Sequence, residues 1–149
     1  GYPPFMFVNA ANLAYDKTLL SSASRQVTVA KEKLLQWDPE VLFLDLSTLQ
    51  LEGEASGFWE IRNDPALKTL SAVQKRKVYG VLPYNWYTKN YGSVLANAYF
   101  IGKVLYPDRF KDVQTAAKAD EIYEFLVGKP VFNQMTAYFN NMAYNEVLE

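Results

Sequence analysis

The stretch that decides the fold is Val41–Leu46 (VLFLDL), an almost unbroken apolar run that follows the helix-stopping pair Asp38-Pro39. Continuous apolar character over so few residues is typical of a strand that is buried on both faces, as in a parallel sheet. Two similar runs, Phe5–Val8 (FMFV) and Val78–Leu82 (VYGVL), lie at nearly equal spacing on either side of it. We therefore predict three parallel strands at these positions.

The segments between these runs carry helical patterns. In Thr28–Trp37, the apolar residues Ala30, Leu34 and Trp37 repeat at helical spacing. The segments 55–61 and 65–70 predict a second, broken helix. The resulting βαβαβ unit is the arrangement that parallel strands require, because they need crossover connections.

The C-terminal half is predicted to be helical. Apolar periodicity indicates helices over 91–105 and 116–127, the first with Gly102 expected to allow close approach to the sheet. Gly128 is expected to end the second helix, and a further stripe runs from Phe132 to Met142 and is typical of core packing. The fold class that follows is α/β, with a small, doubly wound, mostly parallel sheet flanked by helices in a single lobe over residues 1–149.

Composition excludes several classes of function. The chain carries 15 basic and 16 acidic residues, for a net charge of -1, and this balance gives no electrostatic signature of nucleic-acid binding. It contains no cysteine and no histidine, which removes common zinc sites, iron–sulfur ligation and imidazole-based triads. We therefore expect no resident metal, no cofactor and no catalysis.

In open parallel sheets, ligands lie beyond the carboxyl ends of the strands, so the residues after each run are the candidates for a site. They carry amide, hydroxyl and aromatic groups, which suit recognition better than chemistry. An alternative for the aromatic cluster is that its rings close the edge of the core. The predicted ligand-binding residues are Asn9, Asn12, Ser47, Thr48, Tyr84, Asn85, Trp86 and Tyr87, with Gln50, Asn90 and Tyr91 beside them.

A second hypothesis from the residues is an α/β enzyme fragment that acts on a sugar or an ester through Asp45 and Glu60. It requires both carboxylates in one cleft, about 5–10 Å apart for glycosidic chemistry. The favoured reading of Asp45 is structural, as an acid that pairs with a backbone donor near the strand end.

Several blocks resemble one protein family. Residues 29–35 (VAKEKLL), followed by 37–44 (WDPEVLFL), resemble a block of the substrate-binding proteins that serve ABC importers of iron–siderophore complexes, haem and cobalamin. Later blocks look like the C-terminal part of the same proteins, especially the iron-complex branch. Each block alone is weakly specific for the family, and the order and spacing of the blocks together are more specific. These blocks are 77–87 (KVYGVLPYNWY), 92–98 (GSVLANA), 105–110 (LYPDRF) and 119–123 (ADEIY).

The resemblance implies a two-lobed periplasmic-binding-protein-like architecture, of which this chain is the C-terminal lobe and the N-terminal lobe is absent. It implies a monomeric, extracytoplasmic protein, anchored as a lipoprotein, that binds an iron chelate such as a ferric siderophore between its lobes. Cobalamin, haem, and molybdate or tungstate remain alternative ligands.

The same resemblance implies a contact with a membrane permease. In the family, a glutamate at the position of Glu32 docks onto arginines of the permease, which is a charge pair that orients docking. This sequence has Ala30 where the family usually has serine, so we expect Thr28 to cap the helix and Glu32 to be presented slightly differently. From the residues alone, Glu32 reads as part of a solvated helix face.

Overall fold

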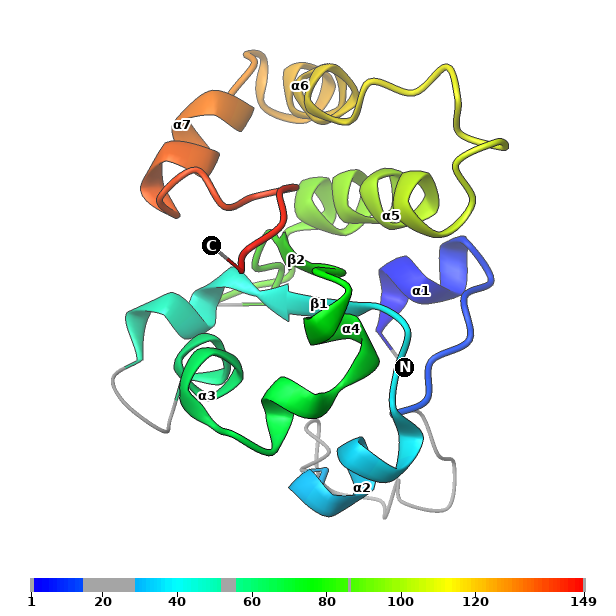
Figure 1. The fold of residues 1–149 in the computed structure, drawn as a ribbon. Helices are drawn as coiled ribbons and strands as arrows, with labels where there is room; N and C mark the ends of the chain where they lie inside the picture. The colour runs from blue at the N-terminus through cyan, green and yellow to red at the C-terminus, as the bar shows by residue number, and fades with distance from the viewer. Residues whose placement is uncertain (1, 15–28, 52–55, 86, 149) are drawn as a thin grey trace, which may run out of the picture.

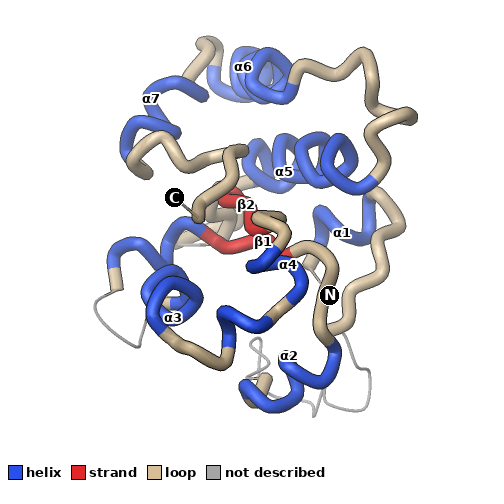
Figure 2. The backbone as a smooth tube through the Cα atoms, in the orientation of Figure 1, coloured by secondary structure: helices blue, strands red, loops and turns tan. Residues whose placement is uncertain are grey.

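The computed structural model describes residues 2–14, 29–51, 56–85 and 87–148, and it shows a small parallel sheet between helices (Figure 1). Strand β1 (Leu42–Asp45) pairs with β2 (Val78–Val81) in the register that sets Leu42 opposite Val78. Figure 2 shows helices on both sides of the two strands. The predicted α/β class with a small parallel sheet is confirmed, and both strands lie where their apolar runs predicted them.

The predicted first strand at 5–8 is wrong, because Pro3–Phe7 forms the short helix α1. Two prolines stand at its first positions, where their fixed φ suits a helix and the missing N–H is not needed. Phe5 and Val8, three residues apart, both pack against the cluster of Val81, Phe100 and Ile101, and the ring centroids of Phe5 and Phe43 lie 5.6 Å apart. Within the described residues the parallel sheet therefore has two strands instead of three.

Helix α2 (Lys31–Trp37) is shorter than the predicted 28–37. Ala30 occupies its N-cap position without a side-chain bond, and the expected cap, Thr28, lies outside the described residues. Leu34 and Trp37 are half-buried as the stripe predicted, whereas Ala30 is exposed.

The broken helix between the strands is present as three short pieces. They are α3 (Gly57–Asn63), the 3₁₀ turn η3 (Leu67–Thr69) and α4 (Ser71–Gln74). The break falls at Asp64-Pro65, where the Asp64 carboxylate accepts the N–H of Ala66 at 2.8 Å. Residue 55, the predicted start, lies outside the described residues.

In the part of the chain that the structure describes, three further helices follow β2: α5 (Tyr91–Leu105), α6 (Thr115–Val127) and α7 (Phe132–Tyr138). Gly128 ends α6 in the left-handed conformation at φ 79°, as predicted. At Gly102 the close neighbour is the ring of Phe110, which a Cβ atom there would overlap. Among the described helices, none combines the length and apolar character needed to cross a bilayer.

The C-terminal segment covers the free edge of β2. Gly80 donates its N–H to the carbonyl of Asn145 at 3.0 Å and accepts the N–H of Tyr144 at 2.9 Å. Val147 donates to the carbonyl of Val78 at 3.0 Å. Strand β2 therefore lies between β1 and this segment, and every residue of β2 except Tyr79 is buried.

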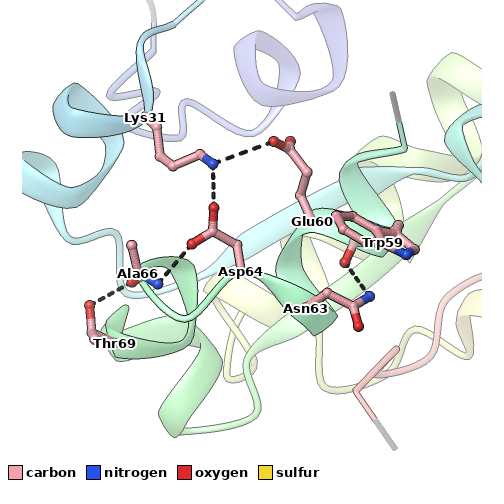
Figure 3. A network of polar contacts seen from close by, with 7 residues as sticks. All are labelled: Lys31, Trp59, Glu60, Asn63, Asp64, Ala66 and Thr69. Atoms are coloured by element: carbon pink, nitrogen blue, oxygen red, sulfur yellow. Dashed lines mark hydrogen bonds and ion pairs between the residues drawn. The ribbon is translucent and has the colours of Figure 1, made fainter. Parts of the chain in front are cut away.

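Polar contacts tie α2 to the crossover that follows β1. Figure 3 shows Lys31 directed at the carboxylates of both Asp64 and Glu60, the latter at 3.7 Å. Asp38, which follows α2, accepts the backbone N–H of Ser71 at 2.7 Å and its hydroxyl at 2.6 Å. These exposed contacts fix both ends of α2 against α3, η3 and α4.

These contacts predict how stability responds to acid. The hydrogen bond from Lys31 lowers the pKa of Asp64, and the bonds from Ser71 lower the pKa of Asp38, both from an ordinary value of 3.8. A carboxylate whose folded-state pKa is depressed stabilises the fold above its unfolded pKa, and that stabilisation is lost as the pH falls below 3.8. We expect the free energy of unfolding of the double variant Asp38→Asn, Asp64→Asn to fall less steeply with acid than that of the wild type. Urea unfolding across this pH range measures both slopes, and equal slopes would contradict the assignment.

Candidate ligand-binding site

A cleft of about 430 Å³ lies beyond the carboxyl end of β2. One wall is the loop between β2 and α5, and the other is α7 with the residues at its two ends. The lining residues are Pro83, Tyr84, Tyr87, Thr88 and Asn90 from the loop, and Val131, Gln134, Met135, Tyr138 and Phe139 from the α7 side. None of these described lining residues is charged, so the cleft offers rings, amides and a hydroxyl to a ligand.

The loop is held at both ends by backbone and side-chain bonds. After β2, Leu82 and Pro83 are buried, and the chain then turns outward at Tyr84. Asn90 donates its backbone N–H to the carbonyl of Tyr84 at 2.7 Å, and its side-chain oxygen accepts the N–H of Ser93 at 3.0 Å. Asn90 therefore closes the loop and caps α5, which fixes the loop base while Tyr87 projects with 94% of its surface exposed.

Tyr84 forms the inner part of the loop wall. Its half-buried ring packs edge-on against Tyr2, with centroids 5.4 Å apart. Burial raises the pKa of the Tyr84 phenol above its ordinary value of 10.0, and the nearby Asp45 carboxylate raises it further. At neutral pH Tyr84 therefore presents an uncharged hydroxyl and an aromatic face.

The α7 wall was not predicted as part of the site. The sequence pattern places the stripe from Phe132 to Met142 in the core. Phe132 and Phe139 are buried, but Met135, Tyr138 and Phe139 line the cleft. The side-chain amide of Gln50 donates to the Tyr138 hydroxyl at 2.9 Å. Gln50 ends the 3₁₀ turn η1 (Leu46–Gln50) that follows β1, so the segments after both strands converge near α7.

The predicted residues after β1 stabilise their own turn. The Asp45 carboxylate accepts the N–H of Ser47 at 2.9 Å, and the Thr48 hydroxyl donates to the Asp45 carbonyl at 2.9 Å. Ser47 and Thr48 are half-buried beside the strand end and do not line the cleft. Asn85 is exposed in the loop without lining the cleft, and Trp86 lies outside the described residues.

Asn9 and Asn12 lie away from this cleft. Because α1 replaces the predicted strand, the chain passes from Tyr2, beside Tyr84, toward the C-terminal end of α5. There the Tyr106 hydroxyl donates to the Asn9 carbonyl at 3.2 Å. Asn12 lines a separate hollow of about 560 Å³ beside α2 and the start of β1. The structure therefore does not bring these two asparagines together with Tyr84.

The two carboxylates of the enzyme hypothesis also lie outside the cleft. Asp45 is bonded to the N–H of Ser47, which is the structural role favoured from the sequence. Glu60 is on α3 and faces Lys31 (Figure 3). Within the described ranges, no group of three or more acidic side chains is placed to hold a metal ion.

Comparisons with known proteins identify the fold. No protein-family profile matches the chain, and no curated protein sequence does. A solved structure described as a periplasmic solute binding protein from Veillonella parvula DSM 2008 superposes with a TM-score of 0.61. This chain shares the fold of part of that protein. The match covers 92% of this chain and 42% of that one at 16% identity, so the likeness is one of fold, and the chain spans less than half of its structural neighbour.

Proposed function

We propose that this chain is one lobe of an extracytoplasmic solute-binding protein that delivers its ligand to an ABC importer without transforming it. The observation that carries the proposal is the cleft at the carboxyl end of β2, lined by three tyrosines, two amides and apolar side chains and by no charged residue among those described. Such a surface packs on and hydrogen-bonds to a ligand but supplies no nucleophile with an adjacent base. The shared fold with a solute-binding protein supports the same role.

The proposed ligand is an iron complex, a ferric siderophore or similar chelate. In such a complex the chelator itself coordinates the iron, so the protein needs surfaces for the organic periphery instead of metal ligands. The rings of Tyr84, Tyr87 and Tyr138 and the amide of Gln134 are groups of that kind. Haem, cobalamin, and molybdate or tungstate are the alternative ligands that the binding experiment distinguishes.

A second lobe is part of the proposal. The chain covers 42% of its structural neighbour, which leaves room for an N-terminal lobe that would close over the cleft. The open cleft, with Tyr87 and Tyr138 exposed, suits a ligand held from two sides. We further propose that the whole protein is monomeric and anchored as a lipoprotein on the outer side of the cytoplasmic membrane.

The binding test is a calorimetric titration of this chain, and of a two-lobed protein that contains it, with a ferric hydroxamate chelate. Haem, cobalamin and molybdate serve as parallel probes. We expect saturable binding of the ferric chelate, with the two-lobed protein binding more tightly because both faces of the ligand are then buried. If all four probes fail to bind either protein, the proposed function is wrong.

Glu32 is proposed to dock onto arginines of the permease. It is exposed in the first turn of α2, and the neighbouring Lys31 holds that helix to Asp64 and Glu60. We expect Glu32→Ala to slow uptake by roughly tenfold while the affinity for ligand stays unchanged, because an interface charge acts on association. Transport assays with labelled ferric chelate measure the first quantity and calorimetry the second. Glu124→Ala, an exposed glutamate on α6, is the matched control, and lost ligand affinity in Glu32→Ala would contradict the assignment.

A further inference from the structure

Asn97 is a buried polar residue in the middle of α5, with 0% of its surface exposed. Its amide pairs with the backbone at the end of β2 as a neighbouring strand would. The Asn97 Nδ2 donates to the Leu82 carbonyl at 2.8 Å, and the Leu82 N–H donates to the Asn97 Oδ1 at 3.1 Å. The segment that leads into the cleft loop is thereby fixed against α5.

The same amide also binds two tyrosine hydroxyls from opposite ends of the chain. Its Nδ2 makes a second hydrogen bond, to the Tyr2 hydroxyl at 3.0 Å, and the Tyr144 hydroxyl donates to its Oδ1 at 3.1 Å. Both donors and both acceptor positions of Asn97 are therefore used. A buried amide is costly unless it is satisfied, and full satisfaction makes one arrangement of its partners strongly preferred.

Each tyrosine leads to a different wall of the cleft. The Tyr2 ring packs edge-on against Tyr84 of the loop wall, with centroids 5.4 Å apart. The Tyr144 ring stacks on Phe132 at 4.9 Å and an interplanar angle of 27°. Phe132 is the first residue of α7, the opposite wall, and its N–H is held by the Asp120 carboxylate at 2.8 Å.

We infer that Asn97 is a positioning residue that sets the separation of the two cleft walls, one through Tyr2 and Tyr84 and the other through Tyr144 and α7. The inference rests on the proposed function, because it treats this cleft as the ligand site. Asn97 does not line the cleft. Besides its bonds to the Leu82 backbone, Asn97 acts on the cleft through the two tyrosine hydroxyls, and each hydroxyl can be removed separately without deleting a ring.

The experiment is ¹⁹F NMR of the chain labelled with 3-fluorotyrosine, in the absence of ligand. The resonances of Tyr84 and Tyr138, one on each wall, are assigned from the variants Tyr84→Phe and Tyr138→Phe. We expect Tyr2→Phe to shift the Tyr84 resonance and leave that of Tyr138 in place. Tyr144→Phe should do the reverse, and Asn97→Leu should shift both.

The matched control is Asn63→Leu. Asn63 is exposed on α3, and its amide donates to the Trp59 carbonyl of the same helix at 2.8 Å (Figure 3). We expect it to move neither resonance. Equal shifts of both resonances in Tyr2→Phe, or no shift at Tyr84, would overturn the inference. If Asn97→Leu does not fold, the two single-hydroxyl variants decide the matter alone.

A titration with the ferric hydroxamate chelate separates this inference from the proposed function. We expect Tyr2→Phe and Tyr144→Phe each to lower the affinity about fivefold, as loss of one buried hydrogen bond predicts. Unchanged affinity in both variants would overturn the positioning role for binding. Failure of the wild type to bind any probe would refute the proposed function, whereas the ¹⁹F shifts would still decide whether Asn97 positions the two walls.

Discussion

Replacing Gly80 with alanine is expected to lower the free energy of unfolding by about 3 kcal/mol, because the new methyl group meets backbone on one side and a core side chain on the other. A Cβ atom at Gly80 would overlap the carbonyl oxygen of Met142 and lie 2.9 Å from the Leu46 Cδ2. Relief requires the C-terminal segment to move away from β2. That movement weakens the two hydrogen bonds that Gly80 makes with Asn145 and Tyr144.

The matched control is Gly57→Ala in the first turn of α3, where a Cβ atom would make only ordinary contact with Leu44 at 3.7 Å. We expect that variant to keep or slightly raise stability, since alanine costs less conformational entropy in a helix than glycine. Urea unfolding measures both variants. Hydrogen exchange at the Tyr144 amide should accelerate in Gly80→Ala alone. Equal stability of the two variants would show that the C-terminal segment does not pack closely on β2.

The parts of the fold that the sequence predicted correctly are those that depend on local pattern. Helix α5 has its predicted bounds, 91–105, because its apolar period is long and Asn90 and Pro107 delimit it. Strands β1 and β2 were found from short, continuous apolar runs next to helix-stopping residues. In both cases the neighbouring residues carry enough information to choose one conformation.

The errors arise where distant contacts decide the conformation. The run Phe5–Val8 is as apolar as the true strands, and four residues do not distinguish a buried strand from one side of a helix. The C-terminal pairing of residues 143–147 with β2 involves a short segment with no strand pattern. The sequence feature that could have predicted this pairing is Gly80, because a glycine inside a strand often marks a place where another backbone approaches closely.

The candidate cleft could be predicted only in part, because one of its walls follows from local sequence pattern and the other depends on contacts between distant residues. The rule for parallel sheets located the loop after β2, which contributes Tyr84, Tyr87 and Asn90 to the cleft. The wrong first strand led the same rule to Asn9 and Asn12, which do not line the cleft. The α7 wall could not be predicted, because it depends on contacts such as the one between Gln50 and Tyr138, 88 residues apart.

Tyr84→Ala is expected to weaken binding of the ferric hydroxamate chelate by about 30-fold, or roughly 2 kcal/mol. Tyr84 is the aromatic ring of the loop wall that Tyr2 holds in place, so it contacts a ligand with little loss of side-chain entropy. Tyr87, on the same loop, is 94% exposed, whereas Tyr84 is half-buried. We therefore expect Tyr87→Ala to weaken binding less than Tyr84→Ala does.

The variant Tyr84→Phe separates the ring from its hydroxyl. Because burial and the Asp45 carboxylate raise the pKa of Tyr84 above 10.0, its phenol is uncharged in the working range, and the ring supplies most of the contact. We expect Tyr84→Phe to bind within about threefold of the wild type, with a constant affinity ratio from about pH 6 to about pH 9. Calorimetry measures both ratios, and Tyr91→Ala, an exposed tyrosine that does not line the cleft, is the control. A loss in Tyr84→Phe as large as that in Tyr84→Ala would mean that the hydroxyl, not the ring, recognises the ligand, and a loss in Tyr91→Ala would place the ligand elsewhere.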